Sequence, residues 1–161
     1  MSFHFRIVTP ERVLSEEDVA SVTLPAADGD ITVLTHHAAY VGLLKPGIVQ
    51  IRHGADPNDD EELAISGGFA NVDETGKTLT ILVETAERGH ELDASVIEAA
   101  KTRAEQVMQN ISRQDDASYA MAAAALQREL ARSRVLSGFR RRKSGLPIGE
   151  QGTIRKDENV S

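Results

Sequence analysis

The sequence predicts an α+β protein, in which an N-terminal antiparallel β-sandwich is followed by a C-terminal antiparallel two-helix hairpin. Short apolar runs separated by turn residues continue through about residue 85, which is typical of a sandwich or barrel. After residue 92 the apolar residues recur every three or four positions, which is typical of helices. We expect a sandwich over residues 1–86, a connector over 87–92, a hairpin over 93–137 and a disordered tail over 138–161.

The first three predicted strands lie between the N-terminus and Pro25. Residues 3–8 alternate between apolar and polar side chains, the period of a half-buried strand. A short second strand begins at residues 13–14, and the polar run 15–18 predicts a solvated turn. Residues 19–24 alternate again as far as Pro25, which cannot donate a backbone hydrogen bond.

The stretch 29–47 predicts two further strands joined by a polar loop. It begins at the turn Asp28-Gly29-Asp30 and ends at the turn Lys45-Pro46-Gly47. Its two apolar runs flank the polar residues Thr35-His36-His37, and another strand over 48–52 follows directly.

Glycines and acidic residues mark the turns in the rest of the predicted sandwich. Residues 53–62 include five acidic side chains and predict an exposed hairpin loop before a short buried strand over 63–65. The run Ser66-Gly67-Gly68 predicts a bulge or tight bend where another backbone comes close. Strands over 69–72 and 78–83 are joined by a hairpin loop that contains glycine.

Two helices are predicted after the connector. Asp93 is a good N-cap for a helix over 95–111, because its carboxylate accepts from the free N–H groups of the first turn. Asp115 or Asp116 caps the second helix, which we expect to run from about 117 to 136. The short break between them predicts an antiparallel pair, and residues from about 144 to 161 are expected to be disordered.

The composition excludes several classes of function. The net charge of −7 divides into 6 Lys+Arg against 16 Asp+Glu up to residue 92, and 12 against 9 thereafter. This acidity argues against general nucleic-acid binding, which needs a basic surface. The absence of cysteine excludes disulfides and thiolate metal sites, and the N-terminus lacks the pattern of a secretory signal. No apolar run reaches the roughly 18 residues that span a bilayer.

The order of these motifs resembles the epsilon subunit of bacterial F-type ATP synthase, a family that includes the chloroplast epsilon and mitochondrial delta subunits. The resemblance covers residues 3–136. Its most specific parts are the stretch 29–47, the Ser66-Gly67-Gly68 run and the two helices that follow. The resemblance implies a sandwich of about ten strands followed by a helical hairpin.

The resemblance also implies a function. Members of the family are non-catalytic rotor subunits of the central stalk of proton-translocating F-type ATP synthase. They bind the gamma subunit and the c-ring, couple ring rotation to gamma, and inhibit ATP hydrolysis when the helices reach the alpha/beta catalytic head. The protein is then expected at the cytoplasmic face of the bacterial inner membrane, as a peripheral protein that contacts the membrane only through the complex. No cofactor is expected.

The resemblance assigns the polar end of the sandwich to the c-ring, with Asp30, His37 and Ala38 as the contacts. This sequence departs from the family there, because it has Thr35-His36 where Pro-Gly is common. A metal site at the paired histidines is not expected, since the chain offers no cysteine and no recognisable ligand spacing elsewhere.

The remaining implied contacts lie at the bend and on the helices. Ser66, Gly67 and Gly68 are expected to contact gamma; the run lacks the Lys-Ser/Thr of a phosphate-binding loop, and a strand follows it. Arg128, Arg132 and Arg134 are expected to meet an acidic segment of the beta subunits, although a solvated helix face would carry the same charges.

ATP binding to the hairpin is not expected. Some members of the family bind ATP through an aliphatic-Asp pair followed three residues later by Arg-Ala. Leu92-Asp93 match the first pair, but Val96 and Ile97 occupy the Arg and Ala positions, so that Asp93 and Arg103 are weak candidates.

Two other functions remain open from the residues alone. A freestanding sandwich could bind partners and dimerise through its helices, which gel filtration would detect as a homodimer without affinity for gamma. A small hydrolase could use His37 and Asp30, which would require activity that is lost in His37→Ala.

Overall fold

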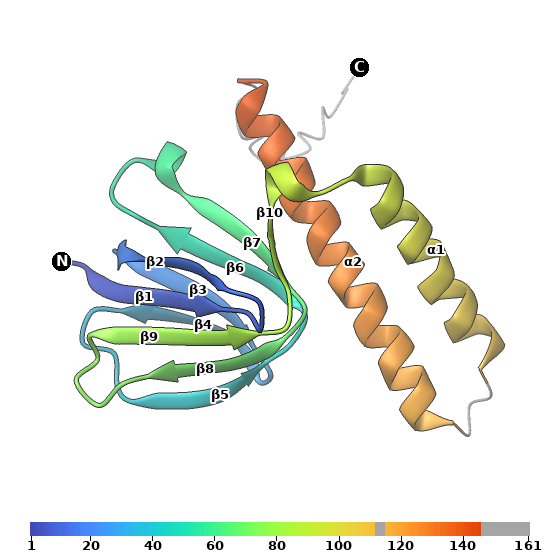
Figure 1. Cartoon of the computed structure of the whole chain (residues 1–161), viewed down its shortest axis with the longest axis horizontal. Coiled ribbons are helices and arrows are strands. Elements are labelled where there is room, and N and C mark those ends of the chain that lie inside the picture. The colour runs from blue at the N-terminus through green and yellow to red at the C-terminus, as the bar shows by residue number, and fades with distance from the viewer. Residues whose placement is uncertain (112–114, 146–161) are drawn as a thin grey trace, which may run out of the picture.

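The protein is described by a computed structural model that covers residues 1–111 and 115–145 (Figure 1). A strand-rich domain is followed by two helices, as expected. The strands are β1 (Phe3–Val8), β2 (Val13–Val19), β3 (Ser21–Ala26), β4 (Gly29–Leu34), β5 (Tyr40–Leu44), β6 (Gly47–Arg52), β7 (Glu61–Ile65), β8 (Gly68–Val72), β9 (Thr78–Val83) and β10 (Ala86–Arg88). The helices are α1 (Ala94–Asn110) and α2 (Asp116–Lys143), with short 3-10 turns η1 (Pro57–Asp59) and η2 (Gly89–Glu91).

The strands form a two-layered sandwich. One layer has the order β10-β7-β6-β3-β4, and the other has the order β5-β8-β9-β1-β2. A single bridge between Ala26 and Leu44 connects β3 to β5 and joins the layers. All pairs are antiparallel except β1 with β9, which run parallel, so the predicted all-antiparallel sandwich needs this one correction. β1 and β9 are connected through strands β2 to β8, and a connection of this length allows the two strands to run parallel.

Apolar side chains that alternate along the strands fill the space between the layers. Phe5 and Ile7 of β1 and Ile81 of β9 have no exposed surface, which matches the period of two in the sequence. Aliphatic residues from both layers make up the rest of this core, as the low aromatic content requires. Burial of this kind stabilises the fold by about 25 cal/mol per Å² of apolar surface removed from water.

The predicted turn at residues 15–18 is wrong, because these residues continue strand β2. β2 is the last strand of its layer, so its outward side chains are polar and the apolar alternation is missing. Charged partners on β1 replace apolar pairing: Glu16 lies opposite Arg6, and Asp18 lies opposite His4. The edge strand is therefore specified by cross-strand pairs that only the folded sheet brings together.

The sandwich also extends beyond the predicted boundary at residue 86. The short strand β10 pairs with β7 as far as Arg88, within the segment expected to be a connector. Its three residues are too few to show a period, which explains why the sequence does not reveal it.

Both helices begin close to where the sequence predicts, and α2 ends later than predicted. Asp93 caps α1 by accepting from the backbone N–H groups of Ser95 and Val96, and Asp115 caps α2 through the N–H of Ser118. Contrary to the expected disordered tail from 138, α2 continues to Lys143, where Gly138 is buried, Phe139 packs on Gly89 and Arg142 pairs with Glu62. Residues 146–161 of the predicted tail lie outside the described residues.

Candidate interaction surfaces

A row of exposed apolar side chains crosses the outer face of the second layer. Leu43 of β5 lies opposite Phe69 of β8, which lies opposite Leu82 of β9. The three side chains are 56%, 54% and 53% exposed, respectively. Val41, also exposed, extends the row on β5. Adjacent exposed apolar side chains of this size are typical of a protein-binding surface.

The predicted gamma-contact residues border this apolar row. Ser66, Gly67 and Gly68 line a shallow depression together with Phe69 and Leu82. The predicted close approach of backbones is confirmed, since a Cβ on Gly68 would lie 2.0 Å from the carbonyl oxygen of Leu82. The φ of Gly68 is +152° and that of Gly67 is +103°, values that side chains of L-residues disfavour.

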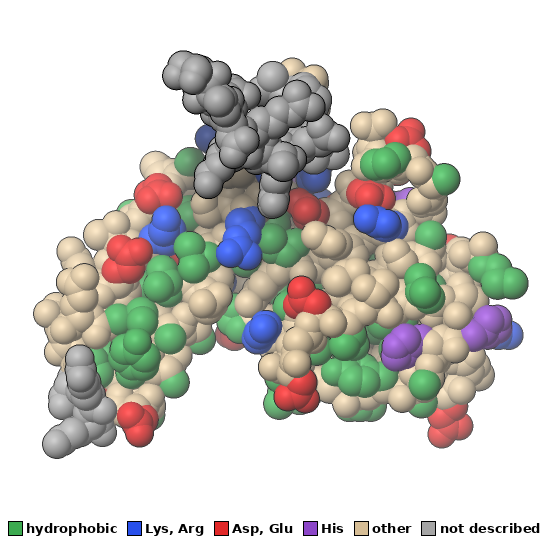
Figure 2. Space-filling model, turned by 180° about the vertical axis from the view of Figure 1, so that it is seen from behind, with side chains coloured by type: hydrophobic (Ala, Val, Ile, Leu, Met, Phe, Trp, Pro, Cys, Tyr) green, Lys and Arg blue, Asp and Glu red, His purple; other side chains and the backbone are tan. Residues whose placement is uncertain are grey.

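The hairpin is attached to the other layer mainly through α2. Ala131 and Val135 of α2 pack on Ala64 of β7, with Ile48 and Leu92 at the margin. The lower part of the hairpin points away from the sandwich, with α1 on its outer side (Figure 1). Hydrophobic side chains are visible on the hairpin in the space-filling view (Figure 2). The buried part of the contact between α2 and the sandwich consists of Ala64, Ala131 and Val135, so it is small compared with the core of the sandwich.

Ion pairs surround the apolar contact. Arg132 donates to Glu87 at β10 and, over 2.7 Å, to Glu129 on its own helix. Arg128 also contacts Glu129, whose side chain is only 2% exposed. Near the end of α2, Arg142 lies 3.5 Å from Glu62 of β7.

A close contact at η2 completes the attachment. Phe139 of α2 lies directly over Gly89, where a Cβ would come within 2.3 Å of the Phe139 Cβ. The Phe139 ring also lies 6.3 Å from the ring of His90, measured between centroids. The turn that begins the hairpin is therefore covered by the end of the same hairpin.

The predicted arginine set is divided by the structure. Arg128 and Arg132 face inward and take part in ion pairs, whereas Arg134 is exposed. Arg134 lines a hollow between α2 and the sandwich, and Asp30 lines the same hollow. Two residues predicted to contact different partners thus lie around one cavity.

The predicted c-ring residues lie toward opposite ends of β4: Asp30 within its start, and His37 and Ala38 in the loop after its end. Asp30 is the second residue of β4, and about 13 Å of strand separates it from Leu34 at the other end. His37 lies in the loop after Leu34, where its Nδ1–H donates to the Ala38 carbonyl over 2.7 Å. Because His37 follows Leu34, the acid–base pair of Asp30 and His37 that the hydrolase hypothesis requires is not formed.

The polar loop itself is held by the neighbouring hairpin. The His36 backbone has a φ of 63°, in the left-handed region. Its N–H donates to the carbonyl of Gly76 over 2.9 Å, which ties the loop to the turn between β8 and β9. His37 and Ala38 are therefore presented from a fixed part of the sandwich.

The two candidate ATP-binding residues are not brought together. Asp93 is fully used as the N-cap of α1, and hydrogen bonds from the Ser95 hydroxyl and from backbone N–H groups lower the pKa of its carboxyl. Arg103 lines an apolar groove between α1 and α2, about 15 Å further along α1.

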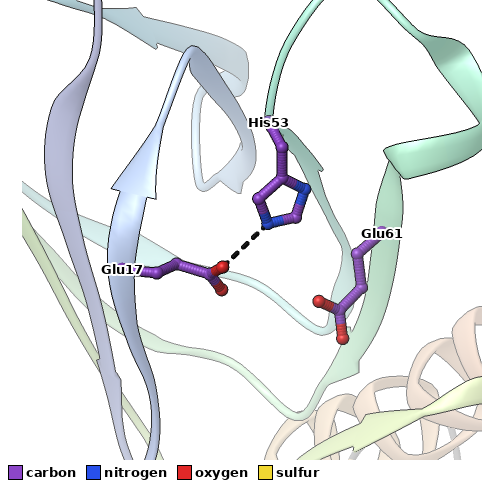
Figure 3. Close-up of side chains that lie close together, drawn as sticks. All are labelled: Glu17, His53 and Glu61. Carbon is purple, nitrogen blue, oxygen red and sulfur yellow. Dashed lines mark hydrogen bonds and ion pairs between the residues drawn. The ribbon is translucent and has the colours of Figure 1, made fainter.

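Three titratable side chains that sequence reasoning missed converge where β2, β6 and β7 meet (Figure 3). His53 Nε2 lies 2.9 Å from Glu17 Oε2, and its Nδ1–H donates to the Asp59 carbonyl over 2.7 Å. Glu61 completes the group, and one ligand atom from each of the three residues lies within 4.8 Å of the other two. No sequence motif would have found it, because Glu17 is far in the sequence from His53 and Glu61, and all three lie in segments predicted to be turns or loops.

The environment of this group favours its charged forms. Burial opposes the imidazolium, but bonds to the Asp59 carbonyl and the Glu17 carboxylate prevail and raise the pKa of His53. For Glu17, burial is likewise outweighed by hydrogen bonds from Ser15 and His53, which lower the pKa of its carboxyl.

Comparison with known proteins places this geometry in context. A family model described as ATP synthase, Delta/Epsilon chain, beta-sandwich domain matches residues 2–89. An ATP synthase epsilon chain of Syntrophomonas wolfei is 36% identical over 83% of this chain and 93% of its own length. One from Rhizobium etli is 42% identical over 65% of this chain and 77% of its own length.

The fold agrees with solved structures as well. A chain from the mitochondrial ATP synthase of Euglena gracilis matches with a TM-score of 0.70 and 24% identity, covering 84% of this chain and 81% of that chain. One from the central stalk and c-ring of Tetrahymena thermophila matches with a TM-score of 0.57 and 20% identity, covering 86% and 96%. Within the described residues, neither helix has the length and apolar character needed to cross a membrane.

Proposed function

This chain belongs to the ATP synthase delta/epsilon family, and we propose that it is the epsilon-type subunit of the central stalk, which couples rotation of the c-ring to gamma and restrains ATP hydrolysis through its hairpin. The observation that carries the proposal is the exposed apolar row beside the Ser66–Gly68 bend, on the layer opposite the hairpin. A rotor subunit with a regulatory hairpin needs its partner-binding surface and its hairpin on opposite layers, because the hairpin must move while the sandwich stays attached.

Gamma is the occupant that we assign to the apolar row. Leu43, Phe69 and Leu82 would be buried on binding, and Phe69 is the largest of them. Aromatic side chains at the centre of an interface usually contribute most to affinity. Gly67 and Gly68 leave an adjacent depression into which a gamma side chain can insert.

The c-ring contact is assigned to the polar loop. His37 and Ala38 are presented from a loop tied to the β8–β9 turn, which provides a fixed surface for attachment to the ring. Asp30 lies near the start of β4, so a ring that touches all three must lie along this strand rather than at its tip. This contact holds the protein at the cytoplasmic face of the inner membrane, peripherally and through the complex.

The brake is assigned to the hairpin. In the folded form, Arg128 and Arg132 are occupied by Glu129 and Glu87. Release of α2 would free these arginines, with Arg134, to meet acidic surfaces of the catalytic beta subunits. The small apolar contact between α2 and the sandwich makes such release inexpensive compared with unfolding the sandwich. The subunit itself is proposed to be non-catalytic, without ATP at Asp93 and Arg103.

The decisive experiment measures ATP hydrolysis by a reconstituted alpha/beta/gamma head with either the full chain or a chain that ends at Leu92. We expect both to bind gamma, because both keep the apolar row, and only the full chain to slow hydrolysis. Equal hydrolysis with both bound would refute the brake. Failure of both to bind gamma would refute the stalk assignment.

A further inference from the structure

We propose that Glu17, His53 and Glu61 form a binding site for a divalent transition-metal ion of the zinc class (Figure 3). One ligand atom from each residue lies within 4.8 Å of the other two. The residues come from β2, from the loop after β6 and from β7, so the ion would join three separate parts of the chain. This site is independent of the proposed stalk function.

The donor set suits zinc. Imidazole nitrogen and carboxylate oxygen are common zinc ligands at about 2.0–2.2 Å, and three protein ligands with one water complete a tetrahedron. Donors at that distance are about 3.3 Å apart in a tetrahedron, estimated from the same bond lengths. The His53–Glu17 separation of 2.9 Å needs only a small widening, which side-chain rotation can supply.

The orientation of His53 is that of a metal ligand. Its Nδ1–H donates to the Asp59 carbonyl over 2.7 Å, so Nε2 is the nitrogen that can bind a metal once its proton is displaced. Histidines that bind metals usually donate their other N–H to such a backbone carbonyl. Without an ion, protonated Nε2 donates to the Glu17 carboxylate; a bound ion would displace that proton and lie between the Nε2 lone pair and the carboxylate.

Each carboxylate is also positioned by an outer partner. The Ser15 hydroxyl donates to Glu17 Oε1 over 2.6 Å, and the Arg88 guanidinium donates to Glu61 Oε1. The second oxygen of each carboxylate, on Glu17 and on Glu61, is then available for an ion. Once the ion displaces the His53 proton, the two carboxylates and Arg88 sum to −1, which partly neutralises a divalent cation.

Another histidine on the same sheet provides a matched control. His4 also lies between two carboxylates, with Asp18 3.2 Å from Nδ1 and Glu16 3.1 Å from Nε2. These carboxylates lie on opposite sides of the ring, so they do not converge with one nitrogen on a common point. His4→Ala therefore removes a histidine of similar charge environment without touching the proposed site.

The test is calorimetric titration of the chelator-treated full chain with zinc chloride. We expect one equivalent to bind, His53→Ala and Glu17→Gln to weaken binding by more than about tenfold, and His4→Ala to keep it. X-ray absorption of the zinc-loaded chain should show one imidazole among N/O ligands at about 2.0–2.1 Å. Zinc should also raise the unfolding temperature of the parent and not of His53→Ala.

Two results would overturn the proposal. One is stoichiometric binding that His53→Ala leaves unchanged, which would place zinc elsewhere on the chain. The other is no stoichiometric binding by the parent, which would leave the group as an ion pair held by a proton. Should circular dichroism show that His53→Ala does not fold, Glu61→Gln and Glu17→Gln decide the same question with the imidazole intact.

Discussion

Arg132 of α2 donates to Glu87 of β10 and, through its other terminal nitrogen, to the buried Glu129. One guanidinium thus connects the hairpin to the sandwich and also neutralises a carboxylate inside the hairpin. A guanidinium that bridges two carboxylates in this way combines charge-assisted hydrogen bonds with fixed geometry. Arg132 therefore holds the hairpin in its docked state, and in the proposed released state the same residue would be free to meet the beta subunits.

Glu87→Gln should release the hairpin while leaving Arg132 available. The partly buried pair is lost, and we expect the docked state to weaken by about 1–2 kcal/mol, a shift of roughly tenfold in population. Hydrogen exchange in the last turns of α2 should accelerate, and inhibition of hydrolysis should increase. Unchanged exchange would show that the apolar contact alone holds α2. Exposed Glu84→Gln serves as the control.

Arg132→Ala should release the hairpin and also weaken the brake. Glu129 keeps only the 3.3 Å contact with Arg128, and an under-compensated buried carboxylate costs about 3 kcal/mol. Exchange in α2 should accelerate as in Glu87→Gln, whereas inhibition should fall. Arg134→Ala tests the exposed arginine and should leave exchange unaltered. Stronger inhibition by Arg132→Ala would mean that this residue does not contact the catalytic subunits.

Phe69→Ser should impair gamma binding without unfolding the sandwich. The side chain is already 54% exposed, so its removal leaves the core intact. Loss of a central aromatic anchor typically costs about 2 kcal/mol, or roughly 30-fold in affinity. Calorimetry with purified gamma measures this. Leu34→Ser removes an equally exposed apolar residue from the other layer and should bind normally; equal losses in both variants would argue against the row.

Gly68→Ala should destabilise the sandwich strongly. The added Cβ would lie 2.0 Å from the Leu82 carbonyl oxygen at a φ of +152°, so strands β8 and β9 must separate. We expect a loss of about 3 kcal/mol or more in the free energy of unfolding, measured with urea. Gly54→Ala, where no atom lies within 4 Å of the Cβ, should change it little. A stable Gly68→Ala protein would contradict the close approach.

Asp93→Asn should make the helix content less sensitive to acid pH. Hydrogen bonds from Ser95 and Val96 lower the pKa of Asp93 from its ordinary 3.8, so its capping contribution is complete above that value. The contribution disappears as the pH falls through the lower folded-state pKa. Asparagine caps equally well but does not titrate, so helicity measured by circular dichroism should lose part of its acid transition. Asp93→Ala should lower helicity at neutral pH; an acid transition identical in Asp93→Asn would exclude this role.

The sequence predicted the features that depend on local chemistry. Alternation of Phe3, Phe5 and Ile7 defined a strand whose inner face is buried, because side chains on a strand alternate between its faces. Asp93 was identified as a cap since helix termini leave backbone N–H groups free. The glycines at 67 and 68 indicated a close backbone approach. The order of these elements was enough to indicate the family.

Only the tertiary structure decided which distant residues meet. The polar strand β2 exists because Arg6 and His4 face its acidic side chains, a pairing that no local period reveals. From the sequence alone, Arg132 could be either solvated or in contact with a partner protein. In the folded protein it pairs with Glu87, which is 45 positions away. Glu17, His53 and Glu61 converge for the same reason. Local physics determines which elements form, whereas long-range packing determines which charges they bring together.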